Sequence, residues 1–393
     1  MEIYQVGGAV RDRLLGLPVY DRDWVVVGAS AERMLAQGYL PVGKDFPVFL
    51  HPDTHEEYAL ARTERKSGHG YAGFLFHAAA DVTLEQDLQR RDLTINAIAA
   101  DNQGHLTDPY GGQQDLQRRL LRHVSPAFAE DPLRVLRVAR FMARFHRLGF
   151  SIDPTTLALM GELSSGVELL ALSAERVWKE TERALNDANP EQYFITLARC
   201  GALQQLMPEL AAAMPCNNKS NHNSSSYATT PALQALMNAT ATSTQASVRW
   251  SVLCRTVATE AELEQLQQRL KSPKLFSDTA RLLWRYHQYL SDPLRADAVM
   301  ALYQGLDLQR RPERLAPFIA GCRALAGLSP TQPFGVAEQL QLLLNTLAQI
   351  QPRTLVAEGF KGAALGQELQ RRQLACLELA LQPSAQQSAQ QQP

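Results

Sequence analysis

The sequence has 393 residues and a formal net charge of −1, with 45% hydrophobic and 20% charged residues. This length exceeds what one compact core usually holds, and the composition is ordinary for a globular protein, so we expect two or three domains. The near-neutral charge excludes a protein that is basic throughout, so a surface for nucleic acid would have to be local.

The cysteines and the hydrophobic pattern indicate the compartment. All five cysteines lie in the second half of the chain and none forms a CxxC pair. This argues against a zinc or disulfide framework and is typical of a reducing compartment. No segment is apolar enough to span a bilayer, and the N-terminus lacks the features of a signal peptide. We therefore expect a cytoplasmic protein with no membrane partner, while the oligomeric state stays open.

The first third of the chain predicts an alternation of short strands and helices. Apolar and β-branched runs predict strands at residues 3–6, 24–27, 48–51 and 57–62, with a helix at residues 9–15. The glycine-rich residues 66–73 predict a mobile loop. This pattern indicates an α/β domain.

From Asp131 onward almost every segment predicts a helix. Pro132 stands where a first-turn proline is tolerated, and apolar residues then recur at helical spacing. Residues 173–176 open a further helix. Residues 215–230, rich in Asn, Ser and Thr, predict a linker, and the Gln- and Ala-rich residues after 383 predict a disordered tail.

A glycine pair joins the first predicted strand to the first predicted helix. Gly7 and Gly8 would let backbone N–H groups approach a phosphate, whose charge the helix N-terminus favours. Arg11, one turn into the helix, could then reach a triphosphate oxygen. Taken alone, such a corner is more often only a tight turn.

Two acidic residues follow at Asp21 and Asp23. On a strand their side chains would point to the same face, where they would repel each other unless a divalent cation lay between them. The alternative is a solvated turn, but the upstream glycine pair favours a polymerase-type site in which one element holds phosphates and the other holds metal. Glu57 is a candidate third carboxylate, although Glu56 and Glu57 are also explained by an exposed strand edge.

Two further segments lie between these carboxylates and the helical half. Arg90 and Arg91 precede Asp92 and Asn96, a set that suits a triphosphate and a ribose hydroxyl. An ion pair at the start of a helix explains this set equally well. Residues 108–112 predict a turn that fixes a corner of the chain.

The predicted helix after Pro132 carries a row of arginines. Asp131, Arg134 and Arg137 fall on successive turns of one broad face. Arg140 is rotated by about 120° from Arg134, so the four side chains cannot all point one way from a straight helix. The alternative is an ordinary salt-bridged helix surface.

The motifs GGAVRD, DRD, RRDLTINA, DPYGG and EDPLRVLRVARF stand in the order and spacing of the class II tRNA nucleotidyltransferases. The sequence resembles the bacterial CCA-adding enzymes of that family from its first residue to about residue 210. Residues 171–176 also resemble the neck motif of the family, and residues 359–362 resemble the tail motif of its enterobacterial-type members. Five linked motifs make this resemblance highly specific.

The resemblance implies a fold and an activity. The fold is an α/β, polymerase beta-like nucleotidyltransferase head at residues 1–137, followed by all-α domains. These are an RNA-binding neck at residues 138–215 and a body and tail at residues 216–383, with a disordered end at residues 384–393. The implied activity is template-independent addition and repair of the 3′-terminal CCA of tRNA from CTP and ATP, with release of pyrophosphate. The acceptor end of the tRNA would lie across the head and its elbow on the helical body.

The resemblance also implies a role for each motif residue. The catalytic residues would be Asp21 and Asp23, which would hold Mg²⁺. The nucleotide-binding residues would be Gly8, Arg11, Arg91, Arg137 and Arg140, together with the base-reading pair Asp131 and Arg134. An arginine donor beside an aspartate acceptor complements the Watson–Crick edges of cytosine and adenine, whereas uracil and guanine would meet each group with its like.

The helical half departs from the family in one respect. Many relatives carry an HD-type phosphohydrolase domain, whose metal site needs histidines and aspartates that converge from several helices. Arg255 and Thr256 stand where the His-Asp pair would be, and the histidines beyond His146 are His222 and His287. Two isolated histidines cannot build that site, so we expect a degenerate HD-like domain without phosphohydrolase activity. His287 is most simply a half-buried helix histidine.

Three alternatives remain. A bacterial poly(A) polymerase would have a similar head, but such enzymes tend to carry a basic C-terminal extension, and this sequence ends in Gln-Gln-Gln-Pro. An enzyme that adds only CC or only A is not separated by the sequence. A non-catalytic RNA-binding protein with an inactive head is opposed by the intact Asp21, Asp23, Arg91 and Arg134.

Overall fold

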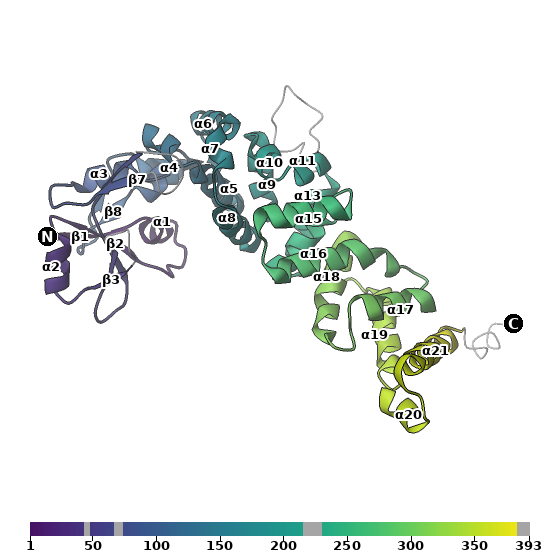
Figure 1. Ribbon diagram of the computed structural model, residues 1–393. Coiled ribbons are helices and arrows are strands. Elements are labelled where there is room, and N and C mark those ends of the chain that lie inside the picture. The colour runs from purple at the N-terminus through teal and green to yellow at the C-terminus, as the bar shows by residue number, and fades with distance from the viewer. Residues whose placement is uncertain (43–47, 67–73, 215–229, 383–393) are drawn as a thin grey trace. The chain divides into compact units, whose positions relative to one another are not determined.

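The computed structural model describes residues 1–42, 48–66, 74–214 and 230–382 (Figure 1). Nearly all of the predicted glycine-rich loop, the predicted linker and the predicted disordered tail lie outside these ranges. The described residues divide into two compact units, residues 1–211 and residues 212–382. The domain boundaries expected from the sequence stay predictions.

The first unit is built on a mixed sheet that has seven strands among the described residues, in the order β3-β4-β5-β2-β1-β8-β9. Its strands are β1 (Glu2–Val6), β2 (Asp23–Val27), β3 (Leu40–Val42), β4 (Val48–Leu50), β5 (Glu57–Leu60), β8 (Ala99–Ala100) and β9 (Leu106–Thr107). β2 pairs in parallel with β5, and the other pairs are antiparallel. Two smaller ladders pair β6 (Thr63–Lys66) with β7 (Phe74–His77), and β10 (Leu120–Leu121) with β11 (Ser151–Ile152).

Short helices lie between the strands, and longer ones follow them. The former are α1 (Gly8–Leu14), α2 (Ala31–Ala36), α3 (Leu84–Gln89) and α4 (Gly112–Arg118), with a 3₁₀ turn at Thr94–Asn96. The latter are α5 (Leu133–Phe145), α6 (Pro154–Ser165), α7 (Val167–Leu170), α8 (Ala174–Asn186), α9 (Pro190–Arg199), α10 (Ala202–Leu206) and α11 (Pro208–Ala213). The predicted strands and the predicted first helix are therefore confirmed, with ends shifted by one or two residues.

The valine run of β2 is buried on both faces of the sheet. Successive side chains of a strand point to opposite faces. Val25 packs in a cluster with Leu88 of α3, whereas Val26 packs in a second cluster with Met34 of α2. Burial on both sides anchors β2, and its first residue, Asp23, is thereby held at a defined place at the end of the sheet.

Two corners depend on glycine. Gly7 joins β1 to α1 with a φ of 69°, in the left-handed region that side chains with a Cβ disfavour, so the predicted glycine corner is confirmed. The predicted turn at residues 108–112 is also confirmed. There Asp108 accepts hydrogen bonds from the backbone N–H groups of Gly112 and Gln113 at 2.7 and 2.8 Å. A Cβ on Gly112 would lie 2.2 Å from the carbonyl oxygen of Thr94.

In the helical part of the first unit, α5 packs against α8 and α9 (Figure 1). The predicted helix start at residues 173–176 is confirmed, because the Ser173 side chain caps α8 by accepting from the Arg176 backbone N–H. The core between these helices contains the buried rings of Phe145, Tyr193 and Phe194. This packing brings polar side chains of α8 beside those of α5.

The second unit is helical. Its helices are α13 (Pro231–Thr242), α14 (Ala246–Cys254), α15 (Glu260–Leu270), α16 (Lys274–Tyr286), α17 (Ala296–Gly305), α18 (Leu315–Leu325), α19 (Gly335–Leu347), α20 (Pro352–Ala357) and α21 (Gly362–Leu381). Its core includes Val248, Leu283, Phe318 and Leu340. Among the described helices of the chain, none has the length and apolar character needed to cross a membrane.

The close approach at Gly112 generates a prediction with a matched control. We expect Gly112→Ala to lower the free energy of unfolding by about 1–3 kcal/mol, because the new methyl group would collide with the Thr94 carbonyl. Gly161 lies within α6 and a Cβ there meets no atom within 4 Å, so Gly161→Ala should raise stability by about 0.5–1 kcal/mol. Urea unfolding of both variants measures the two effects, and equal shifts would contradict this account.

Candidate active site

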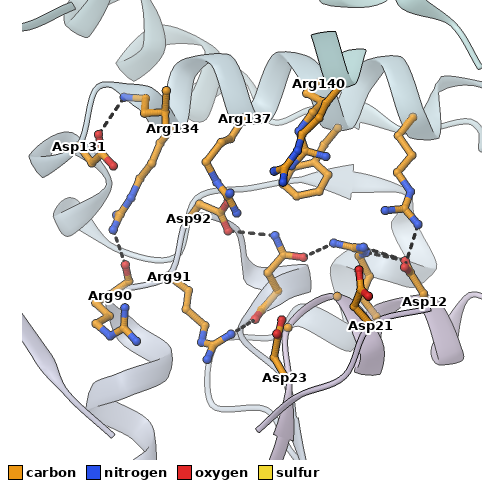
Figure 2. A pocket seen from close by; sticks show the side chains of 18 of the residues that line it. Asp12, Asp21, Asp23, Arg90, Arg91, Asp92, Asp131, Arg134, Arg137 and Arg140 are labelled. Atoms are coloured by element: carbon orange, nitrogen blue, oxygen red, sulfur yellow. Dashed lines mark hydrogen bonds and ion pairs between the residues drawn. The ribbon is translucent and has the colours of Figure 1, made fainter. Parts of the chain in front are cut away.

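The motif residues of the first unit meet at one cavity of about 750 Å³ (Figure 2). Its walls come from α1, the start of β2, the segment after α3, and α5 and α8. Arginines outnumber aspartates among its lining residues, so its charge suits a polyanion such as a triphosphate. All the predicted site residues line it: Gly8, Arg11, Asp21, Asp23, Arg91, Asp131, Arg134, Arg137 and Arg140.

Asp21 and Asp23 both line the cavity, but one detail of their predicted geometry is wrong. β2 begins at Asp23, and Asp21 precedes it in non-strand backbone. The alternation of strand side chains is therefore not what brings the two carboxylates together. Their approach depends instead on the path of the chain from α1 into β2.

The surroundings of Asp21 and Asp23 favour a cation. Partial desolvation in the cavity wall raises the pKa of Asp23, the charge of Arg91 opposes this, and the neighbouring Asp21 carboxylate raises it further. Within the described parts of the chain, neither carboxylate has a hydrogen-bond or ion-pair partner. Oxygen ligands that repel each other and lack protein partners suit a hard divalent metal ion.

Glu57 lies beside Asp23 in the sheet, since the two are Cα partners in the β2–β5 ladder. Glu57 is exposed at the first residue of β5, which agrees with the alternative of an exposed strand edge, although β5 itself is flanked by β4 and β2. Glu57 nevertheless does not line the cavity. Among the described residues, no group of three His, Cys, Asp or Glu side chains is placed to hold a metal ion.

Arg90 and Arg91 lie at the C-terminal end of α3, not at the start of a helix as the ion-pair alternative supposed. Both pair with the buried Asp87, at 2.7 and 3.1 Å. Burial acts to raise the pKa of Asp87, but the charges of Arg90 and Arg91 outweigh it and hold that pKa below its ordinary value. Cations are favourable at this end of a helix.

Arg11 projects from α1 beneath the cavity and is only 3% exposed. It donates to Asp12 at 2.9 Å and to the side-chain oxygen of Asn96 at 2.5 Å, and its guanidinium lies 5.2 and 5.0 Å from the ring centroids of Phe141 and Phe145. Burial lowers its pKa, and the charge of Asp12 opposes that effect. The guanidinium is therefore held in one orientation.

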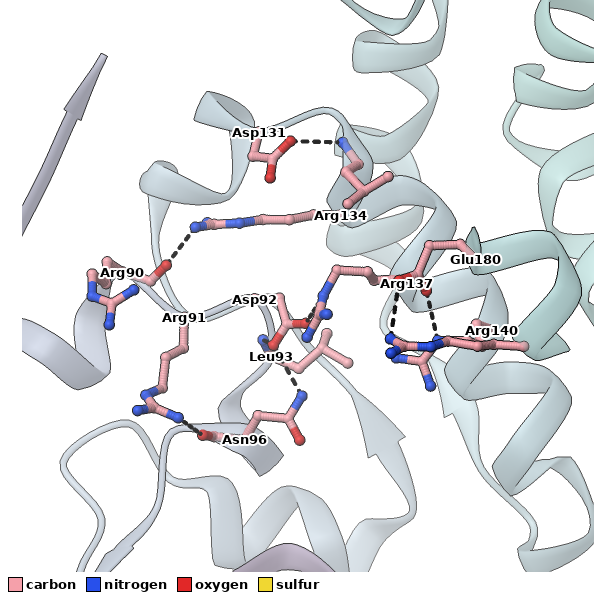
Figure 3. A network of polar contacts seen from close by, with 12 residues as sticks. Arg90, Arg91, Asp92, Leu93, Asn96, Asp131, Arg134, Arg137, Arg140 and Glu180 are labelled. Atoms are coloured by element: carbon pink, nitrogen blue, oxygen red, sulfur yellow. Dashed lines mark hydrogen bonds and ion pairs between the residues drawn. The ribbon is translucent and has the colours of Figure 1, made fainter. Parts of the chain in front are cut away.

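Asp92 is the centre of the polar network that joins the head to α5 (Figure 3). It is 6% exposed and accepts from Arg137 at 2.7 Å, from the Asn96 side chain at 2.9 Å and from the Leu93 backbone N–H at 2.9 Å. Burial acts to raise the pKa of Asp92, but the Arg137 charge and these hydrogen bonds lower it strongly. Asp92 is thus a buried carboxylate that stays ionised.

Asp131 and Arg134 lie at the entry to α5. Asp131 precedes the helix rather than lying on its face, so that part of the prediction is wrong. One of its carboxylate oxygens accepts from the Leu133 backbone N–H at 3.0 Å, and the other pairs with Arg176 of α8 at 2.9 Å. Arg134 donates to the carbonyl oxygens of Ala127 and Arg90 at 2.8 and 2.5 Å (Figure 3).

Arg140 lines the same cavity as Arg134 and Arg137, although the helical rotation predicted that all four side chains could not point one way. It donates to Glu180 of α8 at 2.6 Å. Because that partner is almost fully buried, this is more than the solvated salt bridge of the alternative interpretation. Arg137 and Arg140 each keep a fixed acidic partner and still present N–H groups to the cavity.

In the second unit, Arg255, one of the two residues at the expected HD position, contacts His287. The Nε–H of Arg255 lies 2.9 and 3.0 Å from the two ring nitrogens of His287. His287 lies in a 3₁₀ turn after α16 and is half-buried, and burial together with the Arg255 charge lowers its pKa. His222 lies outside the described residues. The absence of phosphohydrolase activity stays a prediction.

The sequence and the fold both match known proteins. Residues 3–122 match the family model described as the poly A polymerase head domain. Residues 149–214 match the model described as a probable RNA and SrmB-binding site of polymerase A. The chain is 50% identical to the multifunctional CCA protein of Pseudomonas fluorescens over 94% of this chain and 96% of that one. It is 51% identical to the CCA-adding enzyme of Pseudomonas putida over 96% of this chain and 99% of that one.

The chain belongs to the CCA-adding enzymes. Solved structures share its fold. The Bacillus stearothermophilus CCA-adding enzyme in complex with CTP matches with a TM-score of 0.67 and 24% identity, over 96% of this chain and 89% of that one. The Thermotoga maritima CCA-adding enzyme complexed with tRNA matches with a TM-score of 0.65 and 21% identity, over 97% and 90%. The predicted nucleotidyltransferase head with helical domains is confirmed, and this family uses a divalent metal ion.

Some residues that line the cavity were not predicted from the sequence. They are Asp12, Tyr20, Arg62, Arg144, Arg176 and Arg183. Arg144 follows Arg140 by one helical turn and pairs with Asp12 at 2.8 Å, so extending the arginine row along α5 would have found it. Arg176 stands within the neck motif, but its partner, Asp131, is 45 residues away in the sequence.

The buried Asp92 generates a prediction about pH. Its pKa is lowered in the folded state, so its contribution to stability is present above the unfolded pKa of about 3.9 and is lost as the pH falls. We expect Asp92→Asn to reduce the free energy of unfolding by about 2 kcal/mol near neutral pH, because Arg137 loses its charged partner.

Urea unfolding at a series of pH values between about 3 and 7 tests this expectation. The difference between wild type and Asp92→Asn should be constant in the upper part of this range and should shrink below about pH 4. Asp53→Asn, at an exposed position of the same unit, is the control and should match wild type throughout. A difference that stays constant down to the lowest pH would contradict the role of Asp92.

Proposed function

We propose that the chain adds and repairs the 3′-terminal CCA of tRNA, using CTP and ATP and releasing pyrophosphate. The observation that carries this proposal is that three sets of residues meet at one cavity. They are two carboxylates that have no hydrogen-bond or ion-pair partner among the described residues, several arginines oriented by fixed protein partners, and Asp131 with Arg134. The relatives named above, at about 50% identity over nearly the whole chain, support it. So do solved neighbours described as complexes with CTP, with ATP and with tRNA.

The metal ion in this proposal is Mg²⁺, held by Asp21 and Asp23. The donor set fits it, since magnesium prefers carboxylate oxygens together with substrate phosphates. When bound, the ion supplies charge neutralisation at the phosphates and a lower pKa for the attacking hydroxyl. In the reaction, the 3′-oxygen of the RNA forms a bond to the α-phosphorus of the nucleotide. The bond to pyrophosphate breaks, and the hydroxyl proton passes to solvent.

The arginines bind and orient the triphosphate in this scheme. Gly8 would let the backbone approach it, and Arg11, Arg91, Arg137 and Arg140 would donate to its oxygens. Arg11 is oriented by Asn96, and Arg137 and Arg140 by acidic partners. Donors that are already held in place lose little conformational freedom when substrate binds, which favours the aligned geometry for in-line attack.

Asp131 and Arg134 read the base in this proposal. Asp131 accepts a hydrogen bond from the Leu133 backbone N–H and pairs with Arg176. Its carboxylate still has lone pairs that would accept the amino group of cytosine or adenine. Arg134 is fixed by two carbonyl groups, so its guanidinium would donate to the ring nitrogen from a defined position. Selection then needs no template, because the protein supplies the complementary edge.

The remaining assignments belong to the same proposal. Residues 1–137 form the catalytic head, residues 138–215 a neck that binds RNA, and residues 216–383 a body and tail that receive the tRNA elbow. The expected compartment is the cytoplasm. This is supported by the free state of the four cysteines within the described residues, Cys200, Cys254, Cys322 and Cys376.

One incubation separates the proposed activity from its rivals. tRNA that ends at the base before CCA is offered each nucleoside triphosphate alone and then in pairs, and product lengths are measured. We expect two added nucleotides with CTP alone and three with CTP and ATP together. Long products from ATP alone would indicate a poly(A) polymerase. A stop after CC would indicate an enzyme that adds only CC, and a need for a tRNA that already ends in CC would indicate one that adds only A.

The metal assignment has its own test. Asp21→Ala should abolish addition while sparing tRNA binding, and activity in that variant would overturn the metal assignment.

The base-reading pair gives a separate prediction. We expect Asp131→Ala to lose preference against UTP by more than it loses rate with CTP, because the carboxylate that repels the uracil carbonyl is gone. One mismatched polar contact is worth about 1–3 kcal/mol, or roughly five- to 150-fold in selectivity. Ratios of kcat/KM for CTP and UTP measure it. Full retention of the preference against UTP would show that Asp131 does not read the base.

A further inference from the structure

Tyr20 has an unusual position at the mouth of the cavity. It directly precedes Asp21, it lines the cavity, and it is 85% exposed. No other large hydrophobic side chain among the described residues is as exposed. A single exposed ring on a protein surface is ordinary, but a ring that lines a binding cavity and stays exposed there is placed to contact substrate.

Tyr20 also has a free ring face, unlike the other aromatic residue of the cavity. Phe141 is 3% exposed, and the guanidinium groups of Arg140 and Arg11 lie 4.6 and 5.2 Å from its ring centroid. Within the described parts of the chain, Tyr20 has no hydrogen-bond, ring or cation–π partner. Its ring is therefore the aromatic surface of this cavity that remains available to a nucleobase.

The position of Tyr20 indicates which nucleobase its ring would contact, the incoming one or the one at the 3′ end of the RNA. In Figure 2, Asp131 and Arg134 lie on one side of the cavity and Asp21 on the other. In the proposed function the incoming base is read at the first side, and the attacking 3′-hydroxyl is bound at Asp21 and Asp23. Tyr20 adjoins Asp21, with Cα atoms about 3.8 Å apart, and lines the same cavity, so its ring is within reach of a nucleotide whose hydroxyl is bound there.

We propose that Tyr20 is a stacking platform for the 3′-terminal base of the RNA that receives the new nucleotide. This inference rests on the proposed function. The terminal base changes during the reaction, from whichever base precedes CCA to C after each of the first two additions. A ring face accepts any base, whereas a hydrogen-bonding side chain would favour one of them. Stacking therefore suits a site that must align a changing 3′ end with one metal site.

Kinetics on Tyr20 variants test the inference. Tyr20→Ala should lower kcat/KM for a tRNA acceptor-stem helix by on the order of tenfold while leaving KM for CTP unchanged. Tyr20→Phe keeps the ring and should remain close to wild type. The matched control is Leu35→Ala, which removes an exposed apolar side chain of the same unit outside the cavity and should have no effect. Thermal unfolding checks that all variants fold.

A photocrosslink gives a readout that does not depend on activity. The acceptor-stem helix carries 5-iodouridine as its 3′-terminal nucleotide and is irradiated with the protein without nucleoside triphosphate. Mass spectrometry should find the crosslink on Tyr20 in wild type, and Tyr20→Ala should lose it. The inference is overturned if the crosslink is found only on other residues, or if Tyr20→Ala keeps wild-type kinetics. It is also overturned if Tyr20→Phe loses as much activity as Tyr20→Ala, or if the only change is in KM for CTP. If wild type adds no CMP, the proposed function itself fails, and this result is distinct from normal addition by Tyr20→Ala.

Discussion

The ion pair between the buried Asp92 and the partly exposed Arg137 is the interaction on which the site depends. Asp92 also accepts from Asn96, and Asn96 in turn accepts from Arg11, whose guanidinium stacks on rings of α5. One continuous network therefore joins α1, the 3₁₀ turn after α3, and α5 behind the cavity. In a region of low dielectric constant such a network is rigid when every member is paired, and costly when one partner is lost.

This network divides the acidic residues of the cavity into two groups. Asp12, Asp92 and Asp131 each hold an arginine in a fixed orientation. Asp21 and Asp23 have no such partner among the described residues, and desolvation raises the pKa of Asp23. The same residue type thus serves two purposes: some carboxylates position the cations that face the triphosphate, and two remain available for a metal ion.

The described helices of the second unit pack around one core and also carry a contact between a cation and an imidazole. That core includes residues of α14, α16 and α18, and Arg255, which stands where the histidine of an HD pair was expected, contacts His287 of the 3₁₀ turn after α16. A cation beside an imidazole disfavours metal binding, because it opposes the approach of a second positive charge.

Local patterns were sufficient to predict β1, β2, β4, β5 and α1 of the head, since β-branched runs and glycine corners act within a few positions of the chain. They did not predict the short strands β3, β8 and β9 or the helices α2, α3 and α4, whose patterns are too short to stand out. The motifs likewise identified many of the residues that line the cavity, but not Tyr20, Arg62 or Arg144. The motifs did not predict the hydrogen-bond and ion-pair partners of these residues. Asp131 caps α5 and pairs with Arg176, and Arg140 pairs with Glu180, across 45 and 40 residues of sequence. These pairs exist because α8 packs against α5, and a contact between distant segments is set by how their surfaces fit rather than by the order of residues in either one.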